Sequence, residues 1–581
     1  MCGSVALLND TIELESAVRS ALKLLEARGP DGNGISIVSG GALGHCRLSL
    51  RDADGGAQPM KLADGRTLAY VGELYNEHML RNLLQLNGKL PRTASDTETL
   101  AHAIEQWGDQ AWKMIEAMFA VMLLSPDGSV LQLIRDRHGV KPIFFARGAS
   151  TVAAASQPSA LREFGYGQVA SLPALVHYLR TSQVCFHEQS VWSDIQLTPP
   201  GSIVTLGLES ANHATWADEL TFNGEEPTDP AQHSRLTALL NEAVYRQSQA
   251  DTPVGVFLSG GIDSSLLAAL LANMLKNPVR TFAIGLQHDT EDLRYAQVVA
   301  KHIRSVHEQV VLTPDEFFRH MRELTAIRAL PVSLPNEVLI YRLSLQAKNS
   351  VKAVLSGEGA DELFGGYHRL QVRLRNRNRE DTLRAYRDNT AWFSANDLAN
   401  ALQDQTAVTE CLHNDSMELQ RLLKNVPAHA AVRSILLKDH FPHLLLRLDG
   451  ASMAGSIEGR VPFTDSDIVR FAAQLHDKDL APAFGMEKPI LRKSALGLLP
   501  EEVLRRPKRA FSASLATLFE SNAGQLELFN SLSQPVIAKL FDAEKLEKIL
   551  SEDRESQVFH RTWLICSLGM WSDLCRVSQI N

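Results

Sequence analysis

The run Val256-Phe257-Leu258-Ser259-Gly260-Gly261-Ile262-Asp263-Ser264-Ser265 decides how the second half of this 581-residue chain folds. Its apolar first part predicts a buried strand over 254–258, and the pattern of residues 264–275 predicts a helix. Between them, glycines let the backbone approach an anion closely, and the start of the helix offers free N–H groups. Three serine hydroxyl groups add donors. The turn therefore predicts a phosphate site, although it lacks the lysine of a Walker A motif.

A second turn follows another short apolar run, 353–355. It reads Ser356-Gly357-Glu358-Gly359-Ala360-Asp361-Glu362 and carries three carboxylates. Mg²⁺ prefers oxygen ligands and commonly takes one or two carboxylates together with phosphate oxygens. We therefore expect Asp263 and Asp361 to hold a magnesium ion beside the phosphate turn.

The spacing of apolar runs predicts two domains of different class. In the second half, strands at 254–258, 281–284 and 353–355 alternate with helical sequence, which predicts an α/β doubly wound parallel sheet, followed by a largely helical region over 380–581. In the first half, strands at 5–8, 67–71, 120–124 and 130–134, with helices at 14–27 and 97–107, predict an α+β sandwich. A polar stretch with prolines places a linker within 206–232. The predicted domains are therefore residues 1–205 and 233–581.

The composition excludes several classes of function. Hydrophobic residues make up 45% and charged residues 22% of the chain, as in an ordinary globular enzyme, and the net charge of −9 argues against a nucleic-acid-binding protein. Six dispersed cysteines without a CxxC pair argue against a zinc site or a disulfide scaffold. No apolar run of 18 residues suggests a membrane span. We expect a cytoplasmic enzyme that acts on small molecules, and the sequence leaves a homodimer open.

Cys2 follows the initiator methionine and precedes Gly3. Removal of Met1 would leave a thiol and a free α-amine on one residue, and an amine with a pKa near 8 can serve as the base for that thiol. An N-terminal nucleophile of this kind needs no histidine triad. Cys2 is therefore a candidate catalytic residue.

Five ordered segments around this cysteine resemble the class II glutamine amidotransferases, which have an Ntn-type fold. The segments are Cys2-Gly3, Arg28-Gly29-Pro30-Asp31 with Gly34, Gly44-His45-Cys46-Arg47-Leu48-Ser49, Gly72-Glu73-Leu74-Tyr75-Asn76, and Ser95-Asp96-Thr97-Glu98. The resemblance implies that Arg47 holds the α-carboxylate of glutamine, with Leu48 and Ser49 in the same site. It also implies that Glu73 and Asp96 hold the α-ammonium group, and that the N–H of Gly72 stabilises the oxyanion.

One residue departs from the pattern of these amidotransferases. The family usually has an asparagine before the Gly-Glu pair, and its side-chain amide helps to stabilise the oxyanion. This chain has Val71 instead. Losing one oxyanion donor typically costs about 2.7–4 kcal/mol. Either another group takes over this task, or the glutaminase is slow and external ammonia contributes.

The second half resembles the PP-loop ATP pyrophosphatases, and the two halves together resemble the glutamine-hydrolysing asparagine synthetase family. Further matching segments are 281–286, Glu458-Gly459-Arg460-Val461-Pro462-Phe463 and Arg506-Pro507-Lys508-Arg509-Ala510-Phe511. The resemblance implies that ATP and Mg²⁺ are required. It places Leu258, Ile284, Ser356 and Gly357 around adenosine, and the phosphates on Ser259, Gly260, Gly261, Asp263 and Ser264. It makes Glu358 the acid that is important for forming or using the acyl-adenylate. It places Lys508 near the phosphates or near the acyl-adenylate.

The acceptor pocket is the least determined part. Some aspartate-using relatives carry a Thr-Thr-x-Arg element here, whereas this chain reads Leu330-Pro331-Val332-Ser333-Leu334-Pro335-Asn336-Glu337, with Arg342 a few residues on. Gly450 also stands where many relatives have arginine. Without a cation for its α-carboxylate, aspartate would bind poorly. Three hypotheses stay open: an asparagine synthetase, an amidotransferase for another carboxylate (a natural product, peptide or sugar acid), and a non-catalytic homologue, against which the intact Cys2 and acidic residues argue.

Overall fold

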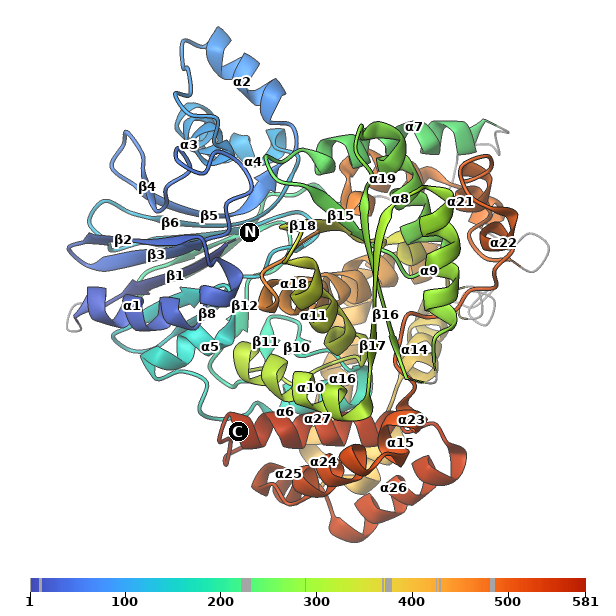
Figure 1. Ribbon diagram of the computed structural model, residues 1–581. Helices are drawn as coiled ribbons and strands as arrows, with labels where there is room; N and C mark the ends of the chain where they lie inside the picture. The colour runs from blue at the N-terminus through green and yellow to red at the C-terminus, as the bar shows by residue number, and fades with distance from the viewer. Residues whose placement is uncertain are drawn as a thin grey trace.

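The computed structural model describes residues 2–9, 13–220, 231–287, 289–367, 370, 379–424, 426–427, 430–480 and 486–581. Figure 1 shows an N-terminal sandwich of two sheets, drawn mainly in blue and cyan, packed against a parallel sheet with helices on its faces. The last helices, in red, lie at the far end from the helices α2 and α3.

The N-terminal sandwich consists of two antiparallel sheets that lie between helices. The order of the first is β10 (Cys185–Phe186), β11 (Gln189–Ser190), β12 (Gln196–Leu197), β8 (Phe144–Arg147), β9 (Val152–Ala155), β1 (Gly3–Leu8), β3 (Gly41–Arg47), β2 (Gly32–Val38). The order of the second is β14 (Ala211–Thr215), β13 (Ser202–Leu206), β7 (Leu131–Arg135), β6 (Ala117–Leu124), β5 (Thr67–Leu74), β4 (Met60–Lys61). Helices α1 (Leu14–Lys23), α5 (Pro158–Leu161) and α6 (Leu172–Thr181) lie on the side of the first sheet, and α2 (Glu77–Leu86), α3 (Asp96–Trp107) and α4 (Ala111–Met114) on that of the second.

Strand β5 shows why this sequence forms a sandwich. Its side chains alternate between the two faces of the sheet. Leu68 and Tyr70 pack into the apolar cluster under α3, whereas Ala69 and Val71 enter the cluster that also contains Cys2. All four are buried, so the middle of the strand is apolar on both faces although each face has a different neighbour.

The second domain is built on a parallel sheet of order β17 (Val306–Leu312), β16 (Arg280–Leu286), β15 (Val254–Phe257), β18 (Ala353–Leu355), β19 (Glu458–Arg460). From β15 the chain moves outward through β16 and β17, then returns to the other side of β15 to form β18. The order reverses between β15 and β18, which makes this pair the topological switch point of a doubly wound sheet. The predicted fold class is confirmed.

Helices flank this sheet and fill the rest of the domain. Those next to the sheet are α7 (Gln232–Ser248), α8 (Ile262–Met274), α9 (Glu291–His302), α10 (Pro314–Arg328), α11 (Asn336–Ala347), α12 (Ala360–Phe364) and α18 (Phe441–Ala454). Further along the chain are α14 (Arg379–Thr390), α15 (Ala395–Ala401), α16 (Gln405–Leu422), α17 (Ala431–Ile435), α19 (Ser466–Gln474), α20 (Asp477–Leu480), α21 (Pro489–Ser494), α22 (Glu501–Leu504), α23 (Leu515–Glu520), α24 (Asn522–Leu532), α25 (Pro535–Leu540), α26 (Ala543–Ser556) and α27 (His560–Leu574). None of the helices in the described ranges is long and apolar enough to cross a bilayer.

The stretch predicted as a linker, 206–232, contains regular structure at both ends. Strand β14 lies within it and pairs with β13 along its whole length, so the second sheet continues beyond residue 205. Helix α7 begins at Gln232. Residues 221–230 lie outside the described residues.

A buried ion triad joins the two domains. Asp449, on α18, lies 2.9 Å from Arg28 and 3.0 Å from Lys141, both of which belong to the sandwich. The three side chains are at most 1% exposed. Burial alone would raise the pKa of Asp449, but the two cations lower it, so the carboxylate stays charged. Removing one charged side chain of the triad would destabilise the fold, because a buried charge without a partner is strongly unfavourable.

We predict that Asp449→Asn lowers the free energy of unfolding by about 3–5 kcal/mol, since it leaves two buried cations with no anion between them. The measurement is the urea or thermal midpoint of the full chain. Asp467→Asn is the control: its partner Arg470 is exposed, and such pairs contribute about 1 kcal/mol at most. Equal midpoints for the two variants would contradict the role of the triad.

Candidate active sites

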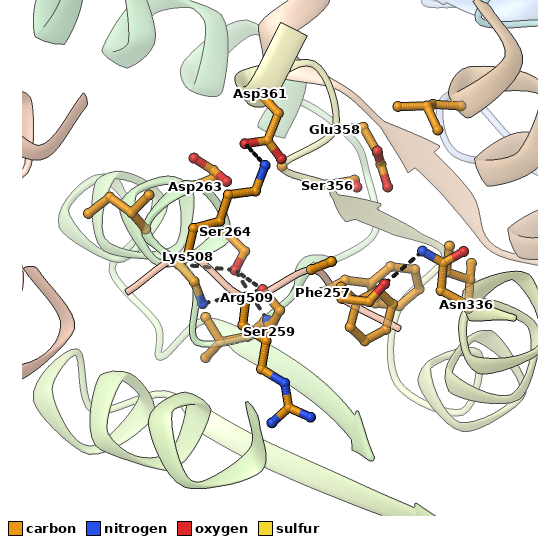
Figure 2. Close-up of a pocket in the computed structure, with 18 of the residues that line it drawn as sticks. Phe257, Ser259, Asp263, Ser264, Asn336, Ser356, Glu358, Asp361, Lys508 and Arg509 are labelled. Atoms are coloured by element: carbon orange, nitrogen blue, oxygen red, sulfur yellow. Dashed lines mark hydrogen bonds and ion pairs between the residues drawn. The ribbon is translucent and has the colours of Figure 1, made fainter. Parts of the chain in front are cut away.

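The two anion-binding turns meet at the carboxyl edge of the parallel sheet. Strands β15 and β18 are neighbours in register, with Val256 opposite Leu355, so the turns that follow them open into the same space. A cavity of about 290 Å³ lies there. Figure 2 shows Asp263, Glu358 and Asp361 directed into this pocket from different sides. Ligands of doubly wound proteins bind at this position of the sheet.

Most residues predicted to bind ATP line this pocket. They are Leu258, Ser259, Gly261, Asp263, Ser264, Ile284, Ser356 and Gly357, and Glu358, Asp361 and Lys508 join them. Gly260 does not line it. Its φ is +70°, and a Cβ there would lie 2.5 Å from the backbone nitrogen of Ala296 on α9. This glycine therefore lets the turn pack against the neighbouring helix.

Gly357 is required by the close approach of the two turns. A Cβ at this position would lie 3.0 Å from Cβ of Asp263 and 3.1 Å from the backbone nitrogen of Ser264. With a side chain at 357, Asp263 and Ser264 would have to shift by a few tenths of an ångström. The glycine thus keeps the two halves of the pocket together.

Lys488 joins the two carboxylates that were predicted to bind magnesium. Its ammonium group lies 2.6 Å from Asp263 and 2.7 Å from Asp361, so both carboxylates converge on one point. Burial alone would raise the pKa of Asp361, but Lys488 and Lys508 lower it to about 2. Oδ1 of Asp263 is buried without a hydrogen-bond partner among the described residues. Two convergent carboxylates, one with a free oxygen, are a donor set that suits Mg²⁺ when phosphate oxygens complete it.

Lys508 also lines the pocket. Its ammonium group is 3.0 Å from Asp361, donates to the carbonyl oxygen of Gly366 at 2.5 Å, and lies over the ring of Tyr367. Glu358 pairs with Arg447 at 2.5 Å. Burial raises the pKa of Glu358, while Arg447 opposes this effect. Sequence reasoning missed Lys488 and Arg447, because no turn motif accompanies either residue.

A second, smaller cavity of about 30 Å³ lies beside Cys2 in the sandwich. Its lining includes the predicted residues Cys2, Arg47, Leu48, Gly72, Glu73 and Asp96, but not Ser49, whose backbone N–H donates to Asp31 instead. Burial raises the pKa of the Cys2 thiol, which is 8% exposed. A base close to the sulfur is therefore needed to form the thiolate.

Arg47 lines this cavity and holds the loop that follows it in the sequence. Its guanidinium group donates to the backbone carbonyl oxygens of Arg51, Asp52 and Ala53, at 2.9, 2.6 and 2.6 Å. Val71 is fully buried in the apolar cluster behind Cys2 and offers no donor. The side-chain amide of Gln58 lies in the cavity wall, but it donates to the carbonyl oxygen of Tyr70 and to Thr97.

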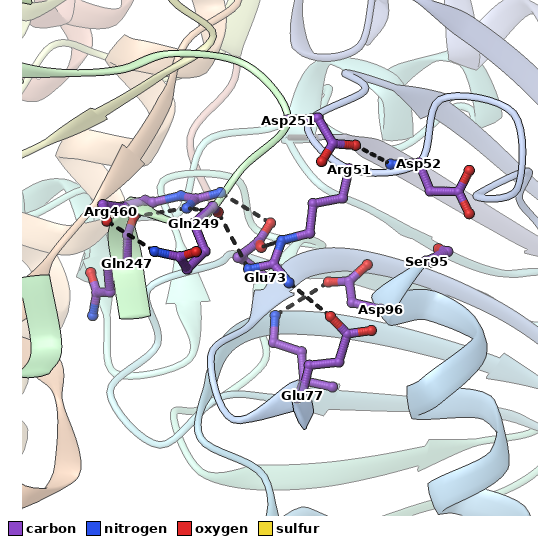
Figure 3. A network of polar contacts seen from close by, with 12 residues as sticks. Arg51, Asp52, Glu73, Glu77, Ser95, Asp96, Gln247, Gln249, Asp251 and Arg460 are labelled. Carbon is purple, nitrogen blue, oxygen red and sulfur yellow. Dashed lines mark hydrogen bonds and ion pairs between the residues drawn. The ribbon is translucent and has the colours of Figure 1, made fainter. Parts of the chain in front are cut away.

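The carboxylates predicted to bind the ammonium group of glutamine already have internal partners, as Figure 3 shows. Arg51 lies 2.6 Å from Glu73 and 2.7 Å from Glu77. Arg460, at the end of β19 in the other domain, lies 3.1 Å from Glu73. Burial raises the pKa of Glu73, with Arg460 and Arg51 opposing it, and raises the pKa of Asp96 to about 6. A substrate cation must therefore compete with Arg51 for this site.

A sequence profile described as Asparagine synthase matches residues 235–573, which contain both turns of the pocket. The chain belongs to the asparagine synthase family. A second profile, described as Glutamine amidotransferase domain, matches residues 1–217, which supply the lining of the cavity beside Cys2 except for Glu458. The family membership predicted from the motifs is confirmed.

Similarity to individual relatives extends over most of the chain. It is 27% identical over 552 residues to asparagine synthetase (glutamine-hydrolyzing) 1 of Bacillus subtilis, an alignment covering 88% of this chain and 87% of the relative. The corresponding figures for asparagine synthetase (glutamine-hydrolyzing) 3 of the same organism are 26% over 573 residues, with coverage of 92% and 90%. An asparagine synthetase (glutamine-hydrolyzing) of Triphysaria versicolor is 27% identical over 545 residues, with coverage of 88% and 78%.

We predict that Arg51→Leu lowers the KM for glutamine by about tenfold, because the substrate ammonium group no longer has to displace a bound cation worth about 1.4 kcal/mol. The measurement is glutamate release at varied glutamine concentration. Arg66→Leu, which removes an exposed pair with Asp64 in the same domain, is the control and should leave KM unchanged. A higher KM in Arg51→Leu would mean that Arg51 assists glutamine binding.

Proposed function

We propose that this chain is a glutamine-hydrolysing asparagine synthetase that converts aspartate, ATP and glutamine into asparagine, AMP, pyrophosphate and glutamate. Its relatives of that name match nearly the whole chain. The observation that carries the proposal is the single pocket in which a phosphate-type turn and an acidic turn face each other, with Asp263, Glu358 and Asp361 inside it. The cavity beside Cys2 supplies the nitrogen-donor half of the same reaction.

Glutamine hydrolysis uses the residues around Cys2. After removal of Met1, the α-amine of Cys2 accepts the thiol proton, and the thiolate attacks the side-chain amide carbon of glutamine. The N–H of Gly72 donates to the oxyanion. The carbon–nitrogen bond then breaks as the α-ammonium group of Cys2 returns the proton to the leaving nitrogen, which departs as ammonia. Water hydrolyses the thioester to glutamate. Arg47 and Glu73 orient the substrate through its carboxylate and ammonium groups.

Activation and amide formation use the second pocket. The side-chain carboxylate of aspartate attacks the α-phosphorus of ATP, and pyrophosphate leaves. Ammonia then attacks the acyl carbon, AMP leaves, and Glu358 accepts a proton from the attacking nitrogen. Lys488 and Lys508 neutralise the charge of the departing pyrophosphate. Asp263 and Asp361 would hold Mg²⁺, which when bound neutralises phosphate charge.

A second candidate function is amidation of another carboxylate. The loop 330–337 carries no arginine, and Gly450 stands where many relatives have arginine. This alternative keeps every step of the mechanism and changes only the acceptor. In both cases the partners are small molecules, and we place the reaction in the cytoplasm, where ATP and glutamine are available.

A pyrophosphate-release screen tests the proposal. With ATP, Mg²⁺ and ammonia supplied, aspartate should give stoichiometric AMP and pyrophosphate together with asparagine. Release with a different acid in the panel, and none with aspartate, would replace the proposed acceptor. The absence of release with every acid would support a non-catalytic homologue.

Two substitutions separate the half-reactions. Cys2→Ala should abolish asparagine synthesis from glutamine, because the nucleophile is lost, and should retain synthesis from ammonia. Asp263→Asn should abolish both, since it removes one of the two carboxylates that converge on Lys488. Glutamine-driven synthesis by Cys2→Ala, or full activity of Asp263→Asn, would contradict these roles.

A further inference from the structure

Arg447 lines the pocket, and the mechanism above gives it no role. It projects from α18, and its side chain is only 4% exposed. One terminal nitrogen lies 2.5 Å from Oε1 of Glu358, and the other donates to the side-chain oxygen of Asn336 at 3.0 Å. Both partners line the pocket. Arg447 therefore joins the acid of the mechanism to the wall of the cavity.

The guanidinium group of Arg447 still has hydrogen-bonding capacity. Its Nε is buried and has no partner among the residues that the structure describes. Burying an unpaired donor is unfavourable, and on a charged group the cost is larger. A bound carboxylate would meet this need, since arginine presents a planar fork that matches carboxylate geometry.

Other cations of the pocket are engaged on the phosphate side. Lys488 and Lys508 pair with Asp361, and Arg509 pairs with Asp289. Arg506 pairs with Asp292, and Arg492 donates to the backbone carbonyl oxygens of Glu487 and Arg506. Arg447 differs from these, because its carboxylate partner is the catalytic acid itself.

The loop 330–337, where the sequence suggested a search for an acceptor-binding cation, lines the pocket with Leu334 and Asn336, but its charged residue is paired inside the protein. Glu337 pairs with Arg328 and accepts hydrogen bonds from the backbone N–H groups of Ser333 and Leu334. Arg328 also fills the space next to Gly450, since a Cβ at 450 would lie 2.8 Å from its Nε. Glu337 and Arg328 thus neutralise each other inside the protein, and neither side chain is directed at a substrate.

We propose that Arg447 binds the acceptor's second carboxylate, the one that is not activated, and that this binding releases Glu358 for catalysis. The proposal rests on the proposed function, in which this group is the α-carboxylate of aspartate. Asn336 fixes the orientation of the guanidinium group. The pocket then selects acceptors with two carboxylates, because a monocarboxylate leaves Arg447 paired with Glu358.

The test compares aspartate with β-alanine, which keeps the activated carboxylate and lacks the other. Pyrophosphate release is measured with ammonia in excess, so that the glutaminase does not limit the rate. In Arg447→Met the KM for aspartate should rise about 10- to 100-fold, the effect of losing a charge-assisted bidentate contact. The kcat/KM for β-alanine should change far less, and discrimination between the two acceptors should fall by the same factor.

Arg447→Lys and Arg342→Met complete the design. Lysine keeps the charge without the fork, so it should restore part of the affinity for aspartate. Arg342 lies on α11, which contributes to the pocket, but its side chain does not line the cavity, so Arg342→Met should behave as the wild type. An unchanged KM for ATP would show that the pocket of each variant is folded.

The outcomes separate the inference from the function. Wild-type turnover of aspartate with an unchanged KM in Arg447→Met would overturn the inference and leave the proposed function standing. An equal loss with aspartate and β-alanine would also overturn it, since that result assigns Arg447 to Glu358 alone. No aspartate-dependent pyrophosphate from the wild type would contradict the proposed function itself.

Discussion

The pairing of β15 with β18 is the constraint on which the synthetase pocket depends. These strands are neighbours only because the chain reverses its direction of growth across the sheet at this point. Each strand ends in a turn whose backbone does not continue the hydrogen bonding of the sheet. The space at the carboxyl ends of β15 and β18 therefore stays open. The phosphate turn and the acidic turn then lie so close that a Cβ at position 357 would be 3.0 Å from Cβ of Asp263. Lys488 lies at that junction, between Asp263 and Asp361.

The charged subsites of this protein are neutralised by its own side chains. Lys488 lies between the carboxylates proposed for magnesium, Arg51 and Arg460 accompany Glu73, and Arg447 accompanies Glu358. Buried charges without partners would destabilise the substrate-free fold. Each ligand must therefore displace or rearrange an internal partner, which lowers affinity but favours ligands of the correct charge.

The interface between the domains is also held by buried ion pairs. Arg460 belongs to the strand next to β18 and reaches Glu73 of the sandwich, while Asp449 of α18 holds Arg28 and Lys141. Helix α18 also carries Arg447. The elements that build the acceptor side of one pocket are thus the elements that fasten the other domain, which keeps the two sites in a defined relation.

The sequence by itself determined the strands that carry the two anion-binding turns, and the turns themselves, because their signals are local. Alternating apolar runs and a Ser-Gly-Gly-x-Asp-Ser turn report on backbone geometry within a few residues, so the fold class and the pocket residues from Leu258 to Gly357 could be predicted. Only the tertiary structure decided the partners of the charges. Lys488 and Arg447 lie far from the turns in sequence, and Arg51 stands in no motif, yet packing places each beside a carboxylate of a site. Long-range ion pairs form wherever buried charges must be compensated, and no local pattern encodes which residue will supply the compensation.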